Sequence, residues 1–309
     1  MTPRFFVRGL AAAVFALALA GCGQPSSPAT PEPPSSAATH PVTDGAGRTV
    51  SLPATPLHIV SLSPAATDIL VAENAQAQIA GVTRYCVLPA ADNSRVARVG
   101  GIVDPDYERI VALRPDLVII PWLADKTLQN KLAALGLNFV VLHPEGLAGT
   151  LADLRLVGAA SGHAAAGEAR AKSIEDLRAL VTQRLHDVPA DQRPRVLIIM
   201  DEASPAPGSY VDDLLAAAGG RNALPTGGRA WLPVAPESIL QLAPDLIVAI
   251  PPLGSTPAAL PPTTAKIVTI TDSAAFYHPG PNLGQALWSL AHALYPARFP
   301  EPNPPPPRP

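Results

Sequence analysis

The stretch "ERIVALRPDL" at residues 108–117 returns as "ESILQLAPDL" at residues 237–246. Both copies place Glu first, Ile third, Leu sixth and Pro-Asp-Leu last, and every shared residue is offset by the same number of positions. The helix dipole favours Glu in a first turn, the Ile and Leu share one helix face, and proline ends a helix. The repeat therefore predicts the same helix followed by a strand in two similar halves of one chain.

The two glutamates of the repeat, Glu108 and Glu237, are not explained by helix construction alone, because Asp or Ser would begin either helix as well. Two similar lobes related by a rough two-fold axis would place one carboxylate on each lobe, on a common face. Such a pair of charges suits docking onto a two-fold symmetric partner. We therefore expect Glu108 and Glu237 to form a docking surface.

Around the repeats, apolar runs alternate with amphipathic ones, which is the pattern of strands and crossover helices in a parallel sheet. A short strand in "HIVSLSP" leads to Ser63, the expected N-cap of a helix from Pro64 to about Glu73. The other predicted elements are strands at 116–120, 138–142, 195–200, 245–250 and 265–271, and helices at 123–135, 210–220 and 282–294. This order predicts two similar α/β lobes.

A proline-free stretch at residues 163–186 is expected to join the lobes as one long helix. It is rich in strong helix formers and places apolar residues at helical spacing. At about 1.5 Å per residue such a helix would be roughly 35 Å long. A rigid connection of this kind favours only small relative motion of the two lobes.

The first 22 residues are typical of a targeting signal. A short basic region is followed by an apolar run at residues 10–20, which is too short to cross a bilayer as a helix. The run ends in Leu-Ala-Gly-Cys at 19–22, which resembles a bacterial lipobox and predicts a lipidated Cys22 at the mature N-terminus. Two or more acyl chains would hold the chain to a membrane surface. The alternative is an ordinary secretory signal with a chance cysteine.

The Pro-rich segments set the outer boundaries of the predicted domains. The stretch that follows Cys22 has too little apolar surface to fold and is expected to be a tether, and the end of the chain is expected to be an extended tail. The expected organisation is a signal peptide at 1–22, a tether at 23–41, an N-terminal lobe at 42–162, an interlobe helix at 163–188, a C-terminal lobe at 189–298 and a Pro-rich tail at 299–309.

Composition excludes several classes of protein. The chain has 309 residues, 48% hydrophobic and 15% charged, so it can bury more than one core and is not disordered over most of its length. A net charge of −3, without a Lys/Arg cluster or a helix-turn-helix or finger spacing, predicts no nucleic-acid partner. No short motif of hydrolases, phosphate-binding loops, zinc proteases or dinucleotide-binding enzymes is present, so we expect no enzyme and no cofactor.

Open parallel sheets bind ligands beyond the carboxyl ends of their strands. Three aromatic residues with few charges are expected there, and they favour a broad, rigid, largely apolar ligand over an ion or a sugar. The alternative for each tryptophan is packing in a core. The candidate ligand-binding residues are Ser63, Tyr85, Cys86, Trp122, Trp231 and His278.

The polar candidates among these have alternative roles. His278, in "FYHPGPN", could coordinate a metal centre or bind a ligand carboxylate, or be an exposed loop residue. With Cys22 lipidated, Cys86 has no disulfide partner, and it is either a small buried apolar residue or a thiolate ligand. The helix that begins after Ser63 could accept an anionic group at its positive end.

Seven segments carry a resemblance to a known family, in order and spacing. They are the helix at 163–186 and "VTDGAGRTVSLP", "HIVSLSPAATDIL", "GVTRYCVLP", "VGGIVDPDYERIVALRPDLVII", "YVDDLLAAAGGRNAL" and "WLPVAPESILQLAPDLIVAI". From residue 42 to about 294 the chain resembles the class III periplasmic binding proteins of ABC importers for vitamin B12, iron-siderophores and haem. The resemblance implies two Rossmann-like lobes with parallel sheets, bridged by one helix, with ligand between them. It also implies that Glu108 and Glu237 dock against arginines of the two permease subunits.

Within that family the aromatic residues Tyr85, Trp122 and Trp231 match positions that contact the corrin ring in vitamin B12-binding members. The chain departs from those members at Ile102, where they have Trp, and at Met200, where they have an aromatic residue. Together with the predicted lipidated Cys22, the resemblance implies a lipid-anchored substrate-binding protein of the periplasm or cell envelope, and we expect a monomer by default. It would deliver a corrinoid to an ABC permease dimer with its ATPase.

Three alternatives remain open on the residues. An iron-siderophore or haem is another small-molecule metal chelate that would suit the same cleft. A metal-binding envelope protein or an enzyme would use Cys86, His143 or His278. An envelope interaction protein that has lost the pocket would agree with the missing aromatic residue at Ile102.

Overall fold

Five parallel strands form the first sheet, in the order β5 (Ala97–Arg98), β4 (Ile79–Val82), β3 (Ile59–Ser61), β6 (Leu117–Ile120) and β7 (Phe139–Val141). The computed structural model describes residues 39–300 except Glu202, Gly228, Leu253, 257–259 and Pro261. The predicted signal peptide, with Cys22, and most of the predicted tether lie outside the described residues.

Short, well-capped helices connect the strands of this sheet. The predicted N-cap is confirmed, because the Ser63 hydroxyl accepts a hydrogen bond from the Ala66 amide and α1 runs over Pro64–Ala72. The other connections contain α2 (Tyr107–Ala112), α3 (Lys126–Ala134) and a 3₁₀ turn (Gln76–Gln78). The elements predicted for residues 59–142 are therefore present in the predicted order, and β4 and β5 are added to them.

The second sheet contains both parallel and antiparallel strands. Its order is β11 (Trp231–Pro233), β9 (Ala203–Pro205), β8 (Arg195–Met200), β12 (Leu246–Ile250) and β13 (Lys266–Thr269), and β10 (Arg221–Asn222) pairs with β8. The expected parallel pairing is present in β8, β10, β12 and β13, whereas β9 and β11 add an antiparallel edge that the sequence did not disclose. The reason is length: β9 begins three residues after β8 ends, which leaves no room for a crossover helix.

Each sheet is covered by helices on both faces. In the first sheet, Ile59, Leu117 and Ile119 face the helical side shared with the second lobe, and the residues between them face α2 and α3. The second sheet alternates in the same way, and α7 (Pro236–Leu242) covers its outer face. Strands buried on both faces explain why their sequences are continuously apolar.

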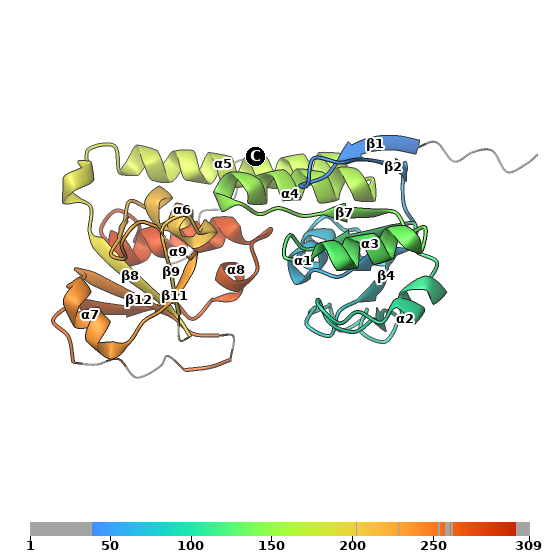
Figure 1. Cartoon of the computed structure of the whole chain (residues 1–309). Helices are drawn as coiled ribbons and strands as arrows, with labels where there is room; N and C mark the ends of the chain where they lie inside the picture. Colours follow the sequence, from blue (N-terminus) through green and yellow to red (C-terminus); the bar gives the residue numbers. More distant parts are fainter. Residues whose placement is uncertain are drawn as a thin grey trace, which may run out of the picture. The chain divides into compact units, whose positions relative to one another are not determined.

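Two long helices join the lobes (Figure 1). The predicted connecting helix is confirmed as α5 (Ala164–Arg184), and it packs along α4 (Gly146–Ser161), which sequence reasoning missed. The two helices approach closely where Gly158 faces Gly167, since a Cβ added to Gly158 would meet the Gly167 Cα at 3.0 Å. Because α4 is largely buried around its circumference, it lacks the polar face that marks a surface helix.

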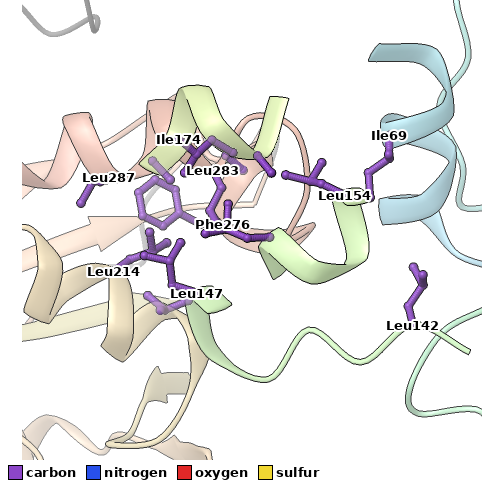
Figure 2. Packing of buried hydrophobic residues seen from close by; sticks show 14 of the residues in the cluster. Ile69, Leu142, Leu147, Leu154, Ile174, Leu214, Phe276, Leu283 and Leu287 are labelled. Carbon is purple, nitrogen blue, oxygen red and sulfur yellow. The ribbon is translucent and has the colours of Figure 1, made fainter. Parts of the chain in front are cut away.

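One hydrophobic core extends through both lobes. Figure 2 shows Leu154 of α4 between Ile69 of α1 in the first lobe and the cluster around Phe276 in the second. Leu147 and Ile174 belong to the same core, as does Leu214 of α6 (Tyr210–Ala217). The lobes therefore share buried apolar surface and are not separate cores linked by a rod.

Both predicted outer boundaries of the lobes need correction. A hairpin of β1 (Thr39–Thr43) and β2 (Thr49–Pro53) starts inside the predicted tether, and the buried Asp44 ties it to the first sheet by accepting a hydrogen bond from the Val141 amide. At the other end, Phe299 was assigned to the Pro-rich tail, but its side chain is fully buried and packs edge-on against Trp288 at 5.2 Å between ring centroids.

The remaining elements complete the second lobe. They are a 3₁₀ turn (Ala190–Gln192), α8 (Ala274–Tyr277) and α9 (Leu283–Leu294), the predicted closing helix. None of the helices that the structure describes combines the length and the apolar character needed to cross a membrane.

Candidate functional site

The repeated segment occupies the same place in both lobes. Helices α2 and α7 each lie on the outer face of a sheet, with Ile110 and Ile239 buried against it. Glu108 and Glu237 lie in the first turns of these helices and are exposed. Each outer layer therefore presents one carboxylate to solvent at an equivalent position.

The aspartate of each repeat has a structural role that the sequence did not disclose. The Asp116 carboxylate accepts hydrogen bonds from the Leu57 and His58 amides at 2.8 and 2.9 Å, just before β3. Asp245 accepts one from the Arg195 amide at 2.7 Å, at the first residue of β8. In each lobe the aspartate of the repeat thus fixes the start of the central strand. The Pro-Asp-Leu shared by both copies is the sequence feature from which this role could have been predicted.

Two of the three predicted aromatic residues lie beyond the carboxyl ends of the first sheet. Tyr85 follows β4 and Trp122 follows β6, on either side of the central β3, and they are 54% and 57% exposed. The Arg84 guanidinium lies 5.3 Å from the centroid of the Tyr85 ring and forms an ion pair with Asp104 at 2.5 Å. Sequence reasoning did not name Arg84 or Asp104, which add charge to an otherwise aromatic edge.

Ser63 and Cys86 are buried beneath that edge. The Cys86 thiol is 4% exposed, and its sulfur is 3.1 Å from the hydroxyl oxygens of both Thr67 and Thr83. Ser63 is 3% exposed and its hydroxyl is used in capping α1. In this conformation neither side chain is presented to a ligand, which agrees with the interpretation of Cys86 as a small buried residue.

The third aromatic residue lies at the antiparallel edge of the second sheet. Trp231 is 38% exposed on β11, and its ring is tilted against that of Tyr210 with 6.3 Å between centroids. The Tyr210 hydroxyl in turn donates a hydrogen bond to the Phe276 carbonyl. Tyr210 was missed from the sequence, and it connects the Trp231 platform to the segment that carries His278.

A cavity of about 260 Å³ lies at the carboxyl ends of β8 and β12. Asp201, Pro251 and Pro252, which follow directly after these strands, are among its lining residues. Asp201 has a φ of 57°, an uncommon backbone conformation for a residue other than glycine. The second sheet therefore offers a hollow with one carboxylate where a ligand site is expected.

His278 connects the second lobe to the first. Its Nδ1 lies 3.6 Å from the Asp68 carboxylate on α1, and the next turn packs Gly280 near Ala65 and Ile69 of that helix. His143 lies elsewhere, with Nε2 3.8 Å from the Glu145 carboxylate. Across the part of the chain that the structure describes, no group of three or more His, Cys, Asp or Glu residues could hold a metal ion.

Residues 59–258 match the model of a protein family described as periplasmic binding protein. The chain belongs to the periplasmic binding protein family. The sequence-based expectations of this family and of its α/β architecture are thus confirmed. Because members of the family bind substrates without transforming them, the expectation of a binding protein and not an enzyme is confirmed on the same basis.

Similar proteins bind different ligands. This periplasmic binding protein is 27% identical to a cobalamin-binding protein of Halobacterium salinarum over 69% of its own length and 59% of the relative's, so the match spans about three fifths of that relative. The molybdate-binding protein MolA of a Haemophilus influenzae ABC transporter is 22% identical, with a TM-score of 0.72 over 84% of this chain and 92% of MolA. The haem-binding protein RhuT of Roseiflexus is 25% identical, with a TM-score of 0.62 over 78% of this chain and 98% of RhuT.

Proposed function

We propose that this periplasmic binding protein is the lipid-anchored substrate-binding component of an ABC importer and that its ligand is a corrinoid. The observation that carries the proposal is the set of exposed aromatic side chains at the carboxyl edge of the first sheet and on β11, the outermost strand of the second. Tyr85, Trp122 and Trp231 are all at least one third exposed, although large aromatic residues are usually buried. Exposed rings at a ligand-binding edge supply rigid apolar contact area for a large planar ligand.

The charges around the aromatic residues also fit a corrinoid. Arg84 and Asp104 form an ion pair beside Tyr85, and Asp201 and His278 offer hydrogen bonds to polar side groups on the second lobe. Polar groups that are few and placed at the periphery suit a ligand with an apolar face and polar side groups. The cobalamin-binding relative in Halobacterium salinarum supports the same choice.

Titration calorimetry of the purified protein with cyanocobalamin tests this assignment. We expect saturable binding with a Kd below about 10 µM, and at least a tenfold loss, about 1.4 kcal/mol, in Trp231→Ala and Trp122→Ala. Leu240→Ala is the matched control, because Leu240 is an exposed apolar side chain on α7, away from the carboxyl edges. If the wild-type protein gives no saturable heat at about 100 µM, the corrinoid assignment is wrong.

Haem and iron-siderophores remain the alternative ligands. They also combine an apolar ring or shell with peripheral acidic groups, and the haem-binding RhuT shares this fold. Tight binding of haemin or of a ferric siderophore, together with no binding of cyanocobalamin, would reassign the ligand and leave the importer role intact.

The permease contact in this proposal is made by Glu108 and Glu237. Their equivalent positions on the outer helices of two similar lobes match a partner with two-fold symmetry. Lipidated Cys22, outside the described residues, would hold the protein at the membrane surface from which the permease receives the ligand. We propose that the protein acts as a monomer, since each lobe supplies one half of the contact.

A further inference from the structure

A groove of about 610 Å³ lies among the helices, away from the carboxyl edges of the sheets. Its lining residues come from the first turn of α4, the second half of α5 and the residues directly after it, the segment before β8, and α6 with Gly219. We call it the helix groove. The residues that line it are Leu147, Ala148, Arg178, Thr182, Leu185, His186, Arg193, Asp213, Ala216, Ala217 and Gly219.

The helix groove carries an excess of cationic groups. Arg178 and Arg193 both line it, and within the described residues neither guanidinium forms an ion pair. The Nε of Arg193 is buried and has no hydrogen-bond partner. A buried guanidinium nitrogen without an acceptor is costly, so an acceptor supplied by a ligand would stabilise it.

The single carboxylate in the groove is already engaged. Asp213 accepts a hydrogen bond from the Leu147 amide at 3.1 Å and lies against Gly146, at the start of α4. His186 also lines the groove, and its Nδ1 donates a hydrogen bond to the Gln183 carbonyl at 2.9 Å. Two guanidinium groups against one engaged carboxylate therefore select for an anion.

We propose that the helix groove is a second ligand site that binds a small molecule bearing a phosphate or carboxylate group. Its volume is within the range of small-molecule sites, and Leu147, Leu185 and three alanines give it apolar lining beside the charges. The site is separate from the one proposed for the transported solute and does not depend on that proposal. Because its walls come from the helices that join the sheets, a bound anion strengthens that junction.

Calorimetric titration of the purified protein with pyrophosphate and with citrate, at constant ionic strength set by chloride, tests the site. We expect at least one probe to bind saturably with a Kd below about 1 mM and to raise the melting temperature. The double variant Arg178→Gln and Arg193→Gln is expected to lose at least about tenfold in affinity. Arg109→Gln, which removes an exposed guanidinium from α2, is the matched control and should bind as the wild type does.

A second variant tests the groove without changing its charge. Ala216→Trp places a large side chain on the exposed face of α6 that lines the groove, so it should block the probe and leave both arginines in place. Melting curves without probe establish that both variants are folded. The proposal is overturned if neither probe binds the wild type up to about 10 mM, or if the double variant or Ala216→Trp binds with wild-type affinity.

Discussion

Glu73, directly after α1, is a buried carboxyl group without a hydrogen-bond partner on either oxygen. It is 2% exposed and faces Gly167 of α5, whose missing side chain leaves room for it. Burial raises the pKa of Glu73 to about 8, and the charge of Arg170 only partly opposes this effect. The folded protein therefore keeps this group protonated at neutral pH, whereas the unfolded chain ionises it.

This difference predicts how stability depends on pH. Between about pH 4.5 and pH 8 unfolding releases the Glu73 proton, so the free energy of unfolding falls as the pH rises through that window. Glu73→Gln should remove this dependence and stabilise the protein at pH 8 by about 4 kcal/mol relative to wild type. Urea unfolding at pH 5 and pH 8 measures both effects.

Two observations make this test specific to Glu73. Asp153 is buried as well, and burial raises its pKa to about 7, so part of the pH dependence must persist in the variant. Glu108→Gln, an exposed acid on α2, is the control and should leave the wild-type dependence unchanged. An unchanged difference between pH 5 and pH 8 in Glu73→Gln would show that this carboxyl is ionised in the fold.

Phe299 is a second residue whose role depends on burial. Its ring packs against Trp288 and lies 5.3 Å from the Arg184 guanidinium, so Phe299→Ala should lower the free energy of unfolding by about 3–5 kcal/mol. Its exposed neighbour provides the control, and Pro300→Ala should change stability by less than about 0.5 kcal/mol. If the two variants were equally stable, Phe299 would not contribute to the core and would belong to the Pro-rich tail.

At the scale of single elements, the parts of the fold that could be predicted are those with a local cause. The N-cap at Ser63, the strands at residues 117–120 and 246–250 and the long α5 each follow from capping, apolar runs or helix propensity. Helix α4 was missed because it is buried nearly all round and rich in glycine. The antiparallel β9 was missed because a strand of three residues has too few positions to show a period.

The candidate site was predictable to the same extent. Tyr85 and Trp122 were named because each comes soon after a short apolar run, "IAGVT" or "DLVII", and Trp231 because it lies in the loop before the second copy of the repeat. Three of their neighbours could not be predicted, because each matters through a partner that is distant in the sequence. The pairs are Arg84 with Asp104, Tyr210 with Trp231, and Asp68 with His278. A single sequence does not show which distant residues become neighbours in the folded protein.

The two copies of the repeat, on α2 and α7, lead to a prediction about docking to the permease. The double variant Glu108→Lys and Glu237→Lys should abolish uptake of ligand by cells and leave the affinity of the purified protein unchanged, since both carboxylates lie on outer helices. Uptake assays and calorimetry on the same variant separate the two effects. Glu175→Lys, an exposed acid on α5, is the control for the change of charge. A tenfold loss of affinity in the double variant would place these residues in the ligand site instead.

At the scale of the whole molecule, the described lobes share more than a connecting helix. The core that includes Ile69 in the first lobe and Phe276 in the second continues through Leu154 of α4 (Figure 2). The approach of His278 Nδ1 to the Asp68 carboxylate at 3.6 Å adds a direct contact between α1 and the loop before α9. This continuity restricts the relative motion of the lobes more than the length of α5 alone, because separating them would expose apolar surface.

A shared core predicts that the two sheets unfold together. Leu154→Ala, in the shared core, and Leu128→Ala, in the outer layer of the first lobe, should each cost about 2–5 kcal/mol, because both remove a buried leucine side chain. In each variant, the denaturation midpoint of β3 and that of β8 should fall by the same amount, because the parts of a cooperative unit unfold together. Hydrogen exchange in denaturant, followed by mass spectrometry of peptides from each strand, measures the two midpoints separately. If Leu128→Ala weakened β3 while β8 kept its wild-type midpoint, the lobes would be independent folding units, and the core through α4 would be a contact surface between them.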